Sequence, residues 1–265
     1  MQPRRDDPAA LYHRIVVWTL FTILLLPLLG TFLYSISTSW SATILPDGLT
    51  LKWYIQLWTE QRFLNAFVQS ILVCTGALLL ATILVLPLLF VVHYHFPKLD
   101  SVMNILILLP FAVPPVVSSV GLLQLYGSGP IAMVGTPWIL IGCYFTIALP
   151  FMYRAITNNL LAINIRDLMD AAHLLGASTW KAAFLVILPN LRKGLVVSLL
   201  LSFSFLFAEF VFANLLVGTR YETLQVYLNN MRNSSGHFSS ALVISYFFFV
   251  LMFTWLANWL NKDRG

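Results

Sequence analysis

Long apolar runs constrain this chain more than any other feature of its sequence. The first, from Ile15 to Ile36, contains no charged residue. A helix needs roughly 20 apolar residues to cross the hydrocarbon core of a bilayer, which is about 30 Å thick. Runs of this kind recur along the whole chain. They predict six membrane-spanning helices, at 15–36, 67–92, 103–125, 138–161, 194–217 and 241–260.

Composition agrees with a membrane protein. Hydrophobic residues make up 59% of the 265 residues and charged residues only 9%, whereas soluble domains carry about a quarter charged residues. A soluble fold of this size could not cover its surface with so few charges. We therefore predict an all-α polytopic membrane protein, with residues 1–265 as a single domain in a lipid bilayer.

Basic residues predict the orientation, because short cytoplasmic loops carry an excess of lysine and arginine. With the amino terminus in the cytoplasm, eleven fall on the cytoplasmic side: Arg4, Arg5, Arg14, Lys98, Arg154, Arg166, Lys181, Arg192, Lys193, Lys262 and Arg264. Four fall on the opposite side: Lys52, Arg62, Arg220 and Arg232. Both termini are predicted to be cytoplasmic. The first apolar run is longer than the 7–15 residues of a signal-peptide core, so we expect it to be retained.

The net charge of +5 needs no nucleic acid to explain it. Basic residues at the membrane edge meet anionic lipid, and no loop shows a basic stripe with interleaved aromatic residues. Cys74 and Cys143 stand alone in apolar runs, without the paired spacing of a metal site or a disulfide. Outside the runs, 51–58 contains three aromatic residues that suit an interfacial helix.

The segment 164–190, between the fourth and fifth runs, carries the most informative residues. Asn164 can cap a helix, and Gly176 is a natural helix stop because glycine adopts a left-handed conformation readily. Ser178 can cap a second helix, Thr179–Ile187, which Pro189 would end. The first helix would carry one small apolar face, made of Leu168, Ala171, Ala172 and Leu175. The residues alone leave two interpretations open: a face that docks on a partner protein, or a helix that lies flat on the membrane.

A resemblance favours the first interpretation. The sequence Asp170-Ala171-Ala172 is followed by Gly176, six positions after the aspartate. Pro189 lies thirteen positions after Gly176. This pattern, with Val186 and Leu188, is similar to the EAA loop of type I binding-protein-dependent ABC importer permeases. Aspartate stands at 170 where that family usually has glutamate, which shortens the reach of the carboxylate. The resemblance extends over most of the chain, including Leu109–Pro115.

Membership in that family would make 164–190 the element that couples this chain to a separate ATPase. The implied coupling residues are Asp170, Ala171, Ala172, Gly176, Ala177, Phe184, Leu188 and Pro189. The implied partners are a dimer of ATP-binding subunits, a second permease subunit, homologous or identical, and an extracytoplasmic solute-binding protein. The chain would lie in the bacterial inner membrane without a cofactor or a metal. Its overall sequence is similar to that of polyamine permeases, and aminoethylphosphonate and ferric-iron permeases share much of this similarity.

Catalytic motifs are missing from the sequence. It has no phosphate-binding G-x-x-x-x-G-K-[ST], no H-E-x-x-H and no G-x-S-x-G. We therefore expect a non-catalytic subunit. Two alternatives are a self-sufficient secondary transporter, which would need more intramembrane polar groups, and an integral-membrane enzyme.

Glu209 is the one acid deep in a predicted span, where a charge is costly and usually faces a cavity or a partner. Ser198, Ser202 and Glu209 fall on one stripe if the span is a continuous helix. We predict that these three residues line the translocation path. The alternative is that Glu209 only packs, paired with Arg220 or with a neighbouring helix. Pro110, Pro114 and Pro115 predict a break in the third span.

Overall fold

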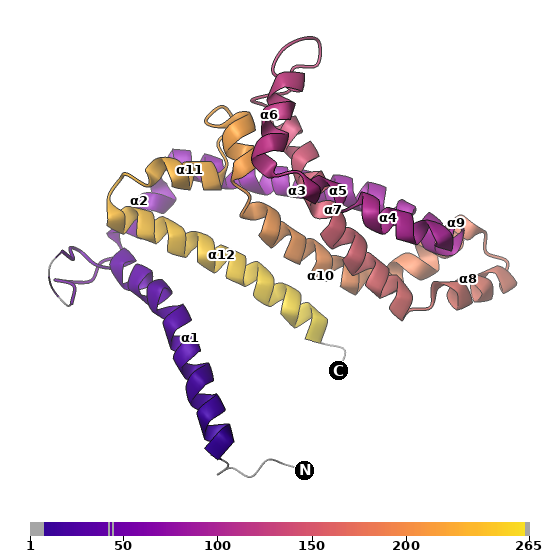
Figure 1. The fold of residues 1–265 in the computed structure, drawn as a ribbon, viewed down its shortest axis with the longest axis horizontal. Helices are drawn as coiled ribbons and strands as arrows, with labels where there is room; N and C mark the ends of the chain where they lie inside the picture. The colour runs from indigo at the N-terminus through magenta and orange to yellow at the C-terminus, as the bar shows by residue number, and fades with distance from the viewer. Residues whose placement is uncertain (1–7, 42, 44, 263–265) are drawn as a thin grey trace. The chain divides into compact units, whose positions relative to one another are not determined.

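The computed structural model describes residues 8–41, 43 and 45–262, and within them the chain is helical (Figure 1). Arg4, Arg5 and Arg264 of the charge count lie outside the described residues, as do the side chains of Lys193 and Lys262. The helices are α1 (Pro8–Ser35), α2 (Lys52–Thr59), α3 (Gln61–Tyr94), η1 (Pro97–Leu99), α4 (Asp100–Leu106), α5 (Leu109–Ala112), α6 (Pro115–Tyr126), α7 (Pro137–Ala162), α8 (Ile165–Leu174), α9 (Thr179–Ala182), η2 (Ala183–Ile187), α10 (Leu188–Phe207), η3 (Ala213–Val217), α11 (Leu224–Met231) and α12 (Gly236–Lys262).

These helices are consistent with six spans: four single helices and two bent helix pairs. α1, α3, α7 and α12 are each long and apolar enough to cross a membrane. The other two spans are helix pairs, Pro97–Ala112 with Pro115–Tyr126 and Thr179–Arg192 with Gly194–Phe207, bent by 85° and 59°. The all-α polytopic fold is confirmed. The orientation of the termini stays a prediction.

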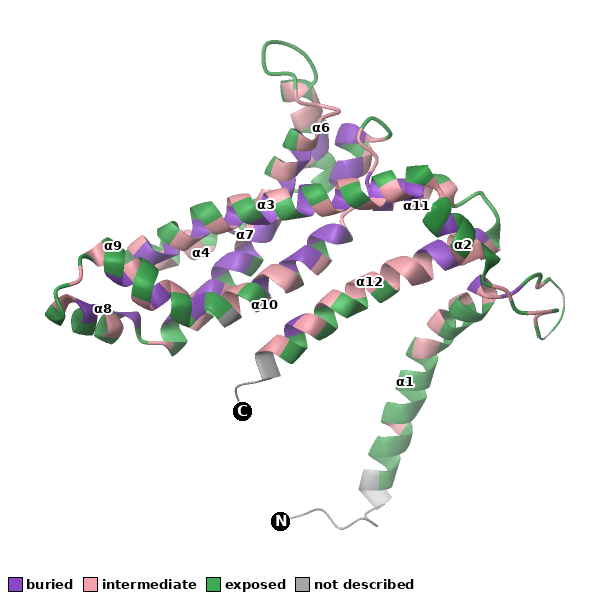
Figure 2. Cartoon of the chain, turned by 180° about the vertical axis from the view of Figure 1, so that it is seen from behind, coloured by how far each residue is buried: buried purple, intermediate pink, exposed green. Residues whose placement is uncertain are grey.

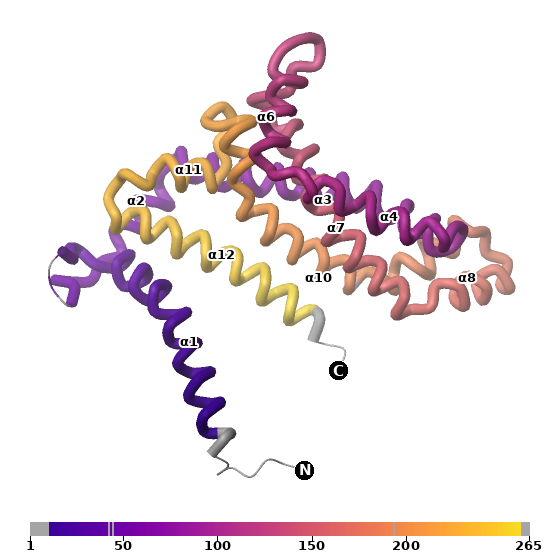
Figure 3. The backbone as a smooth tube through the Cα atoms, viewed as in Figure 1, coloured from indigo at the N-terminus to yellow at the C-terminus, as the bar shows by residue number. Residues whose placement is uncertain are grey.

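The predicted proline break in the third span is confirmed. The backbone turns sharply at Val113, which is extended, and Pro114 caps α6 without donating a hydrogen bond (Figure 3). A residue before proline is pushed out of the helical region, and proline favours the first turn of a helix. The sequence Val-Pro-Pro therefore ends α5 and starts α6.

The chain clusters into two compact units. The first unit comprises Met1–Glu60 and Asn230–Phe247, and the second comprises Gln61–Asn229 and Phe248–Gly265. The single domain expected from the sequence stays a prediction.

An aromatic cluster organises the first unit. The His237 ring stacks on Tyr34 and on Trp53, with centroids 4.1 and 5.5 Å away. The Trp53 indole donates a hydrogen bond to the Ser37 carbonyl at 2.9 Å. The expected helix at 51–58 is present as α2, but its Trp53 is engaged in this cluster. In contrast, α1 is exposed along nearly its whole length, as Figure 2 shows.

The core of the second unit is built by α3, α7 and α10. Cys74, Ala77 and Ala81 line the buried side of α3, and Leu140 and Met152 that of α7. Small residues let apolar helices approach closely without any charged contact. Where α7 meets α10, a Cβ added at Gly194 would overlap the Asn159 side chain. This packing holds the fixed ends of the 164–190 segment, which joins α7 to α10.

Candidate functional site

The turn at Gly176 separates α8 from α9. Gly176 has φ +81°, and its N–H donates to the His173 carbonyl at 2.8 Å while the Ala177 N–H donates to the Ala172 carbonyl at 3.0 Å. These two bonds make a Schellman motif, which satisfies the last carbonyls of a helix and requires a left-handed residue. The predicted helix stop at Gly176 is therefore confirmed. A Cβ at this position would meet no atom within 4 Å.

The two faces of α8 differ from the prediction. Ile165, Met169 and Ala172 are buried, whereas Leu174 and Leu175 are 90% and 89% exposed. The predicted single face was therefore wrong, because Ala172 turns inward while Ala171 and Leu175 face out and Leu168 is half-buried. The period of 3.6 allowed either grouping, and Ile165 and Met169 supply the larger buried area. The outer face presents Asp170, Ala171, Leu174 and Leu175.

The predicted side-chain caps are absent. Asn164 occupies the position before α8, at φ +47°, but its side-chain amide donates to the Asp167 carboxylate instead of accepting from a backbone N–H. Ser178 precedes α9 without any side-chain cap bond. Asparagine tolerates the left-handed region better than most residues, so Asn164 serves as a turn residue here.

Pro189 does not end the second helix, and that prediction was wrong. The helical path runs from α9 through η2 into α10, with Pro189 in the first turn of α10. η2 is a π-helical turn in which the Leu188 N–H donates to the Ala183 carbonyl, five residues back. Such a widened turn relieves the clash between a proline ring and the carbonyl four residues earlier. A sequence pattern cannot show this extra residue in the turn.

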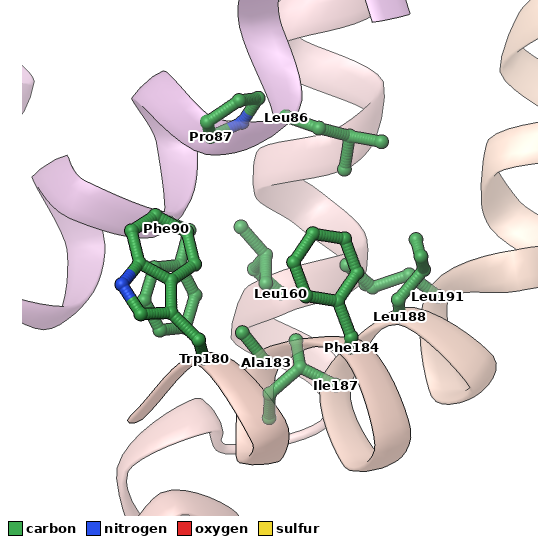
Figure 4. A pocket seen from close by; sticks show the side chains of 10 residues that line it. All are labelled: Leu86, Pro87, Phe90, Leu160, Trp180, Ala183, Phe184, Ile187, Leu188 and Leu191. Carbon is green, nitrogen blue, oxygen red and sulfur yellow. The ribbon is translucent and has the colours of Figure 1, made fainter. Parts of the chain in front are cut away.

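An apolar pocket of about 120 Å³ lies behind α9 (Figure 4). Trp180 and Phe184 stack at 6.3 Å and point toward Phe90 of α3 and Leu160 of α7. Leu188 also lines this pocket. Phe184 and Leu188 therefore line a pocket against α3 and α7, although Phe184 stays largely exposed. Of the other predicted coupling residues, Ala177 is half-buried and Pro189 is exposed.

Glu209 lies in a break between helices. α10 ends at Phe207 and helix resumes at Val211. The Glu209 carboxylate accepts hydrogen bonds from the backbone N–H groups of Phe212 at 2.9 Å and Ala213 at 3.2 Å. The expected stripe through Ser198, Ser202 and Glu209 is wrong, because the helix that carries the serines stops before Glu209. The carboxylate instead caps the next helical segment, where free N–H groups favour a negative charge.

Of the packing alternative, the pairing with Arg220 is not seen in the described part of the chain, whereas a contact with a neighbouring helix, α7, is present. Among the described residues, the structure shows no ion pair between Glu209 and Arg220. A nearer polar neighbour is Tyr144, whose hydroxyl donates to the Glu209 backbone carbonyl at 3.4 Å.

Ser198 and Ser202 line a cavity of about 630 Å³ between α7, α10 and the α4–α5 region. Arg154 and Asn158, one helical turn apart on α7, line the same cavity. Sequence reasoning missed both residues as site residues, because Arg154 was counted only as a basic residue of the cytoplasmic side. The signal was available: Arg154 falls inside the predicted span 138–161, where an arginine usually faces a cavity.

Comparison with known proteins places these features in a family. Residues 93–264 match the sequence model of one family, described as "binding-protein-dependent transport system inner membrane component". The fold is shared with a bacterial ABC transporter involved in the import of the acidic polysaccharide alginate, at a TM-score of 0.75 and 14% identity, covering 100% of this chain and 99% of that one. A second structure, of a bacterial alginate transporter in complex with an alginate-bound periplasmic protein, gives a TM-score of 0.71 at 15% identity, covering 96% and 94% of the chains.

Sequence relatives are transport permeases. PhnV of Salmonella paratyphi A, by its name a 2-aminoethylphosphonate transport system permease protein, is 29% identical over 74% of this chain and 73% of its own length. The sulfate transport system permease protein CysW of Escherichia coli is 29% identical over 62% and 61%. PotC of Haemophilus influenzae, a spermidine/putrescine transport system permease protein, is 28% identical over 67% and 68%.

The chain is thus a multi-pass inner-membrane subunit of the ABC importer class. It belongs to the family of binding-protein-dependent transport system inner membrane components. Subunits of this family are not catalytic, and the ATPase is a separate partner. Family membership rules out the two alternative functions, a self-sufficient transporter and a membrane enzyme.

Proposed function

We propose that this chain forms half of a solute pathway and is coupled to its ATPase through the 164–190 segment. The observation that carries the proposal is the outer face of α8. Leu174 and Leu175 are almost fully exposed at the end of a helix whose opposite face is buried, and Asp170 and Ala171 lie beside them. Exposed apolar side chains rimmed by charge are typical of a protein docking site.

The mechanism follows from how α8 is held. Ile165, Met169 and Ala172 fix its inner face, and α9 runs without a stop through η2 into α10. A displacement of α8 is therefore passed directly to α10, which lines the 630 Å³ cavity. Movement of the docked ATPase would thus widen or narrow the cavity. This arrangement supports alternating access in a pair of permease subunits, with solute delivered by an extracytoplasmic binding protein.

The solute belongs to the small ions that the relatives' names indicate: a phosphonate, sulfate or a polyamine. An acid in the path would suit a cation such as a polyamine. Because both Glu209 oxygens accept backbone hydrogen bonds, Glu209 gives no support for a polyamine.

Gly176→Val tests the coupling role. Valine is strained at φ +81° because its Cβ and branched side chain disfavour the left-handed region, so the turn must rearrange and tilt α8. Gly129→Val is the matched control, since Gly129 has φ +94° and equally open surroundings but lies outside the segment. The whole importer is reconstituted in liposomes, and ATP hydrolysis stimulated by its loaded binding protein is measured.

We expect Gly176→Val to lower the stimulated hydrolysis at least about tenfold, the equivalent of one lost 1.4 kcal/mol contact, while Gly129→Val stays near wild type. Both variants should accumulate in the membrane, because the spans are untouched. Normal stimulated hydrolysis by Gly176→Val, with the ATPase bound, would remove the coupling role and return α8 to a helix resting on the membrane.

A further inference from the structure

The cavity beside Ser202 carries a positive charge that no described residue pairs with. Arg154 is the one charged residue among those that line it, and the structure shows no ion pair to Arg154 in the described part of the chain. Arg154 lies eight residues before the end of α7 at Ala162, which is about 12 Å along the helix. An unpaired guanidinium inside a predicted span is costly, so such residues usually face a cavity and a ligand.

Polar groups that suit an anion accompany Arg154. The Asn158 amide lies one turn further along α7, and Ser202 is almost fully buried at 3% exposure on α10. Neither the Asn158 amide nor the Ser202 hydroxyl has a hydrogen-bond partner among the described residues. By contrast, the Ser198 hydroxyl already donates to the Leu195 carbonyl at 2.8 Å. The guanidinium, the amide and the hydroxyl thus offer N–H and O–H donors from two helices to the same cavity.

The rest of the wall is apolar. Phe111, Phe151 and Phe205 form a continuous aromatic surface, with ring centroids 6.1 and 4.7 Å apart. Pockets for small molecules typically combine apolar walls with a few convergent polar groups and measure about 300–1,000 Å³. The volume of about 630 Å³ lies within that range.

We propose that Arg154, Asn158 and Ser202 form an oxyanion-binding site in the pathway, and that the transported solute therefore carries a phosphonate or sulfate group. Guanidinium binds such oxygens with two parallel hydrogen bonds, which are about twice as strong as neutral ones. A polyamine would meet an uncompensated positive charge here and be repelled. The inference rests on the proposed function, because it takes the cavity to be part of the solute path.

Charged thiol reagents test the site without knowledge of the solute. A Ser202→Cys variant is made in a background with Cys74 and Cys143 replaced by alanine, and the whole importer is purified in detergent so that both faces are open. Its reaction rates are measured with anionic 2-sulfonatoethyl and with cationic 2-(trimethylammonium)ethyl methanethiosulfonate. Each rate is divided by the rate at which the same reagent reacts with free 2-mercaptoethanol. The ratio of these two normalised rates, anionic over cationic, reports the electrostatic potential at position 202.

We expect the anionic reagent to be favoured roughly tenfold, because a unit charge a few ångströms away has this effect even at the dielectric constant of water. Adding Arg154→Gln should bring the ratio close to one, whereas Lys98→Gln, a basic residue outside the cavity, should leave it unchanged. A ratio near one with Arg154 present would overturn the proposal, and would indicate that an acid of the second permease subunit neutralises Arg154. Absence of reaction with both reagents would overturn it too.

Uptake separates the two sources of the oxyanion. Liposomes that contain the importer and its binding protein are supplied with 2-aminoethylphosphonate, sulfate or spermidine. Accumulation of one of the two oxyanions, lowered at least tenfold by Arg154→Gln with ATPase docking intact, supports the proposal. Accumulation of spermidine contradicts it. These results do not depend on Gly176, so this inference and the coupling role fail separately.

Discussion

The chain interrupts its helices at Gly176 and at Glu209 in opposite ways. At Gly176 the backbone itself makes the turn, at φ +81° and in open space. At Glu209 a side chain makes the break possible, because its carboxylate accepts hydrogen bonds from the N–H groups of Phe212 and Ala213. The first turn is exposed, and the second break is surrounded by buried residues such as Phe207 and Ala213.

The difference predicts which changes affect function and which affect folding. A side chain added at Gly176 displaces no neighbour, but it strains the left-handed backbone there and so tilts α8, while the membrane-spanning helices keep their own sequence. Loss of the Glu209 carboxylate leaves the buried N–H groups of Phe212 and Ala213 without this acceptor, and the unpaired groups destabilise the fold.

Topology gives an all-or-none test. A coupling role requires the Gly176 turn to lie outside the bilayer, on the cytoplasmic side. A cysteine at Ser178 should then react with a membrane-impermeant thiol reagent only in inside-out vesicles, and a cysteine at Ser234 only from the opposite face. Both serines are exposed. Labelling of both from the same face would contradict the six-span topology.

Glu209→Ala should give the largest loss of stability. Two buried N–H groups lose their acceptor, each at roughly 1–3 kcal/mol, so the unfolding free energy should fall by about 3 kcal/mol. Membrane accumulation and the thermal unfolding of the purified importer measure this loss. Glu209→Gln is the matched variant, since its amide oxygen retains one acceptor, and it should lose less than half as much.

A different outcome would restore the pathway role of Glu209. If Glu209→Ala and Glu209→Gln both accumulate and unfold normally but lower uptake equally, the carboxylate acts on the solute and not on the helix end.

Asp170 should give a smaller effect, confined to function. Asp170 is exposed on the outer face of α8, so Asp170→Lys reverses a charge at the proposed ATPase contact without disturbing the core. Stimulated ATP hydrolysis should fall several-fold, and more at low salt, because surface charge contacts are screened. Asp170→Glu keeps the charge and should remain within about twofold of wild type. An unchanged rate for Asp170→Lys would place this carboxylate outside the contact.

Sequence reasoning succeeded where one local property decides the structure. Apolar length was enough for α1, α3, α7 and α12, and Val113-Pro114-Pro115 was enough for the break before α6. Gly176 as a helix stop follows from glycine chemistry alone.

The predictions failed where contacts with other residues, and not one local property, decide the structure. The inward turn of Ala172 depends on what Ile165 and Met169 pack against, and the passage through Pro189 depends on a π-helical turn that no pattern reveals. The helix break at Glu209 could not be predicted from hydropathy. Mean hydropathy is taken over a window of residues, so an apolar run has the same value whether or not the helix is interrupted. One signal was present: an acid directly before an apolar stretch is also a helix-capping pattern.

The central claim is that the outer face of α8 contacts the ATPase, and cross-linking tests it most directly. Ala171→Cys places a thiol beside Leu174 and Leu175 on that face, and Ser234→Cys is the control. Each variant is treated in the assembled importer with a short thiol-to-amine cross-linker, and the products are identified by mass. We predict a covalent adduct with the ATPase from position 171, lost in Gly176→Val, and none from position 234. No ATPase adduct from position 171 in an importer that hydrolyses ATP on stimulation would contradict this prediction.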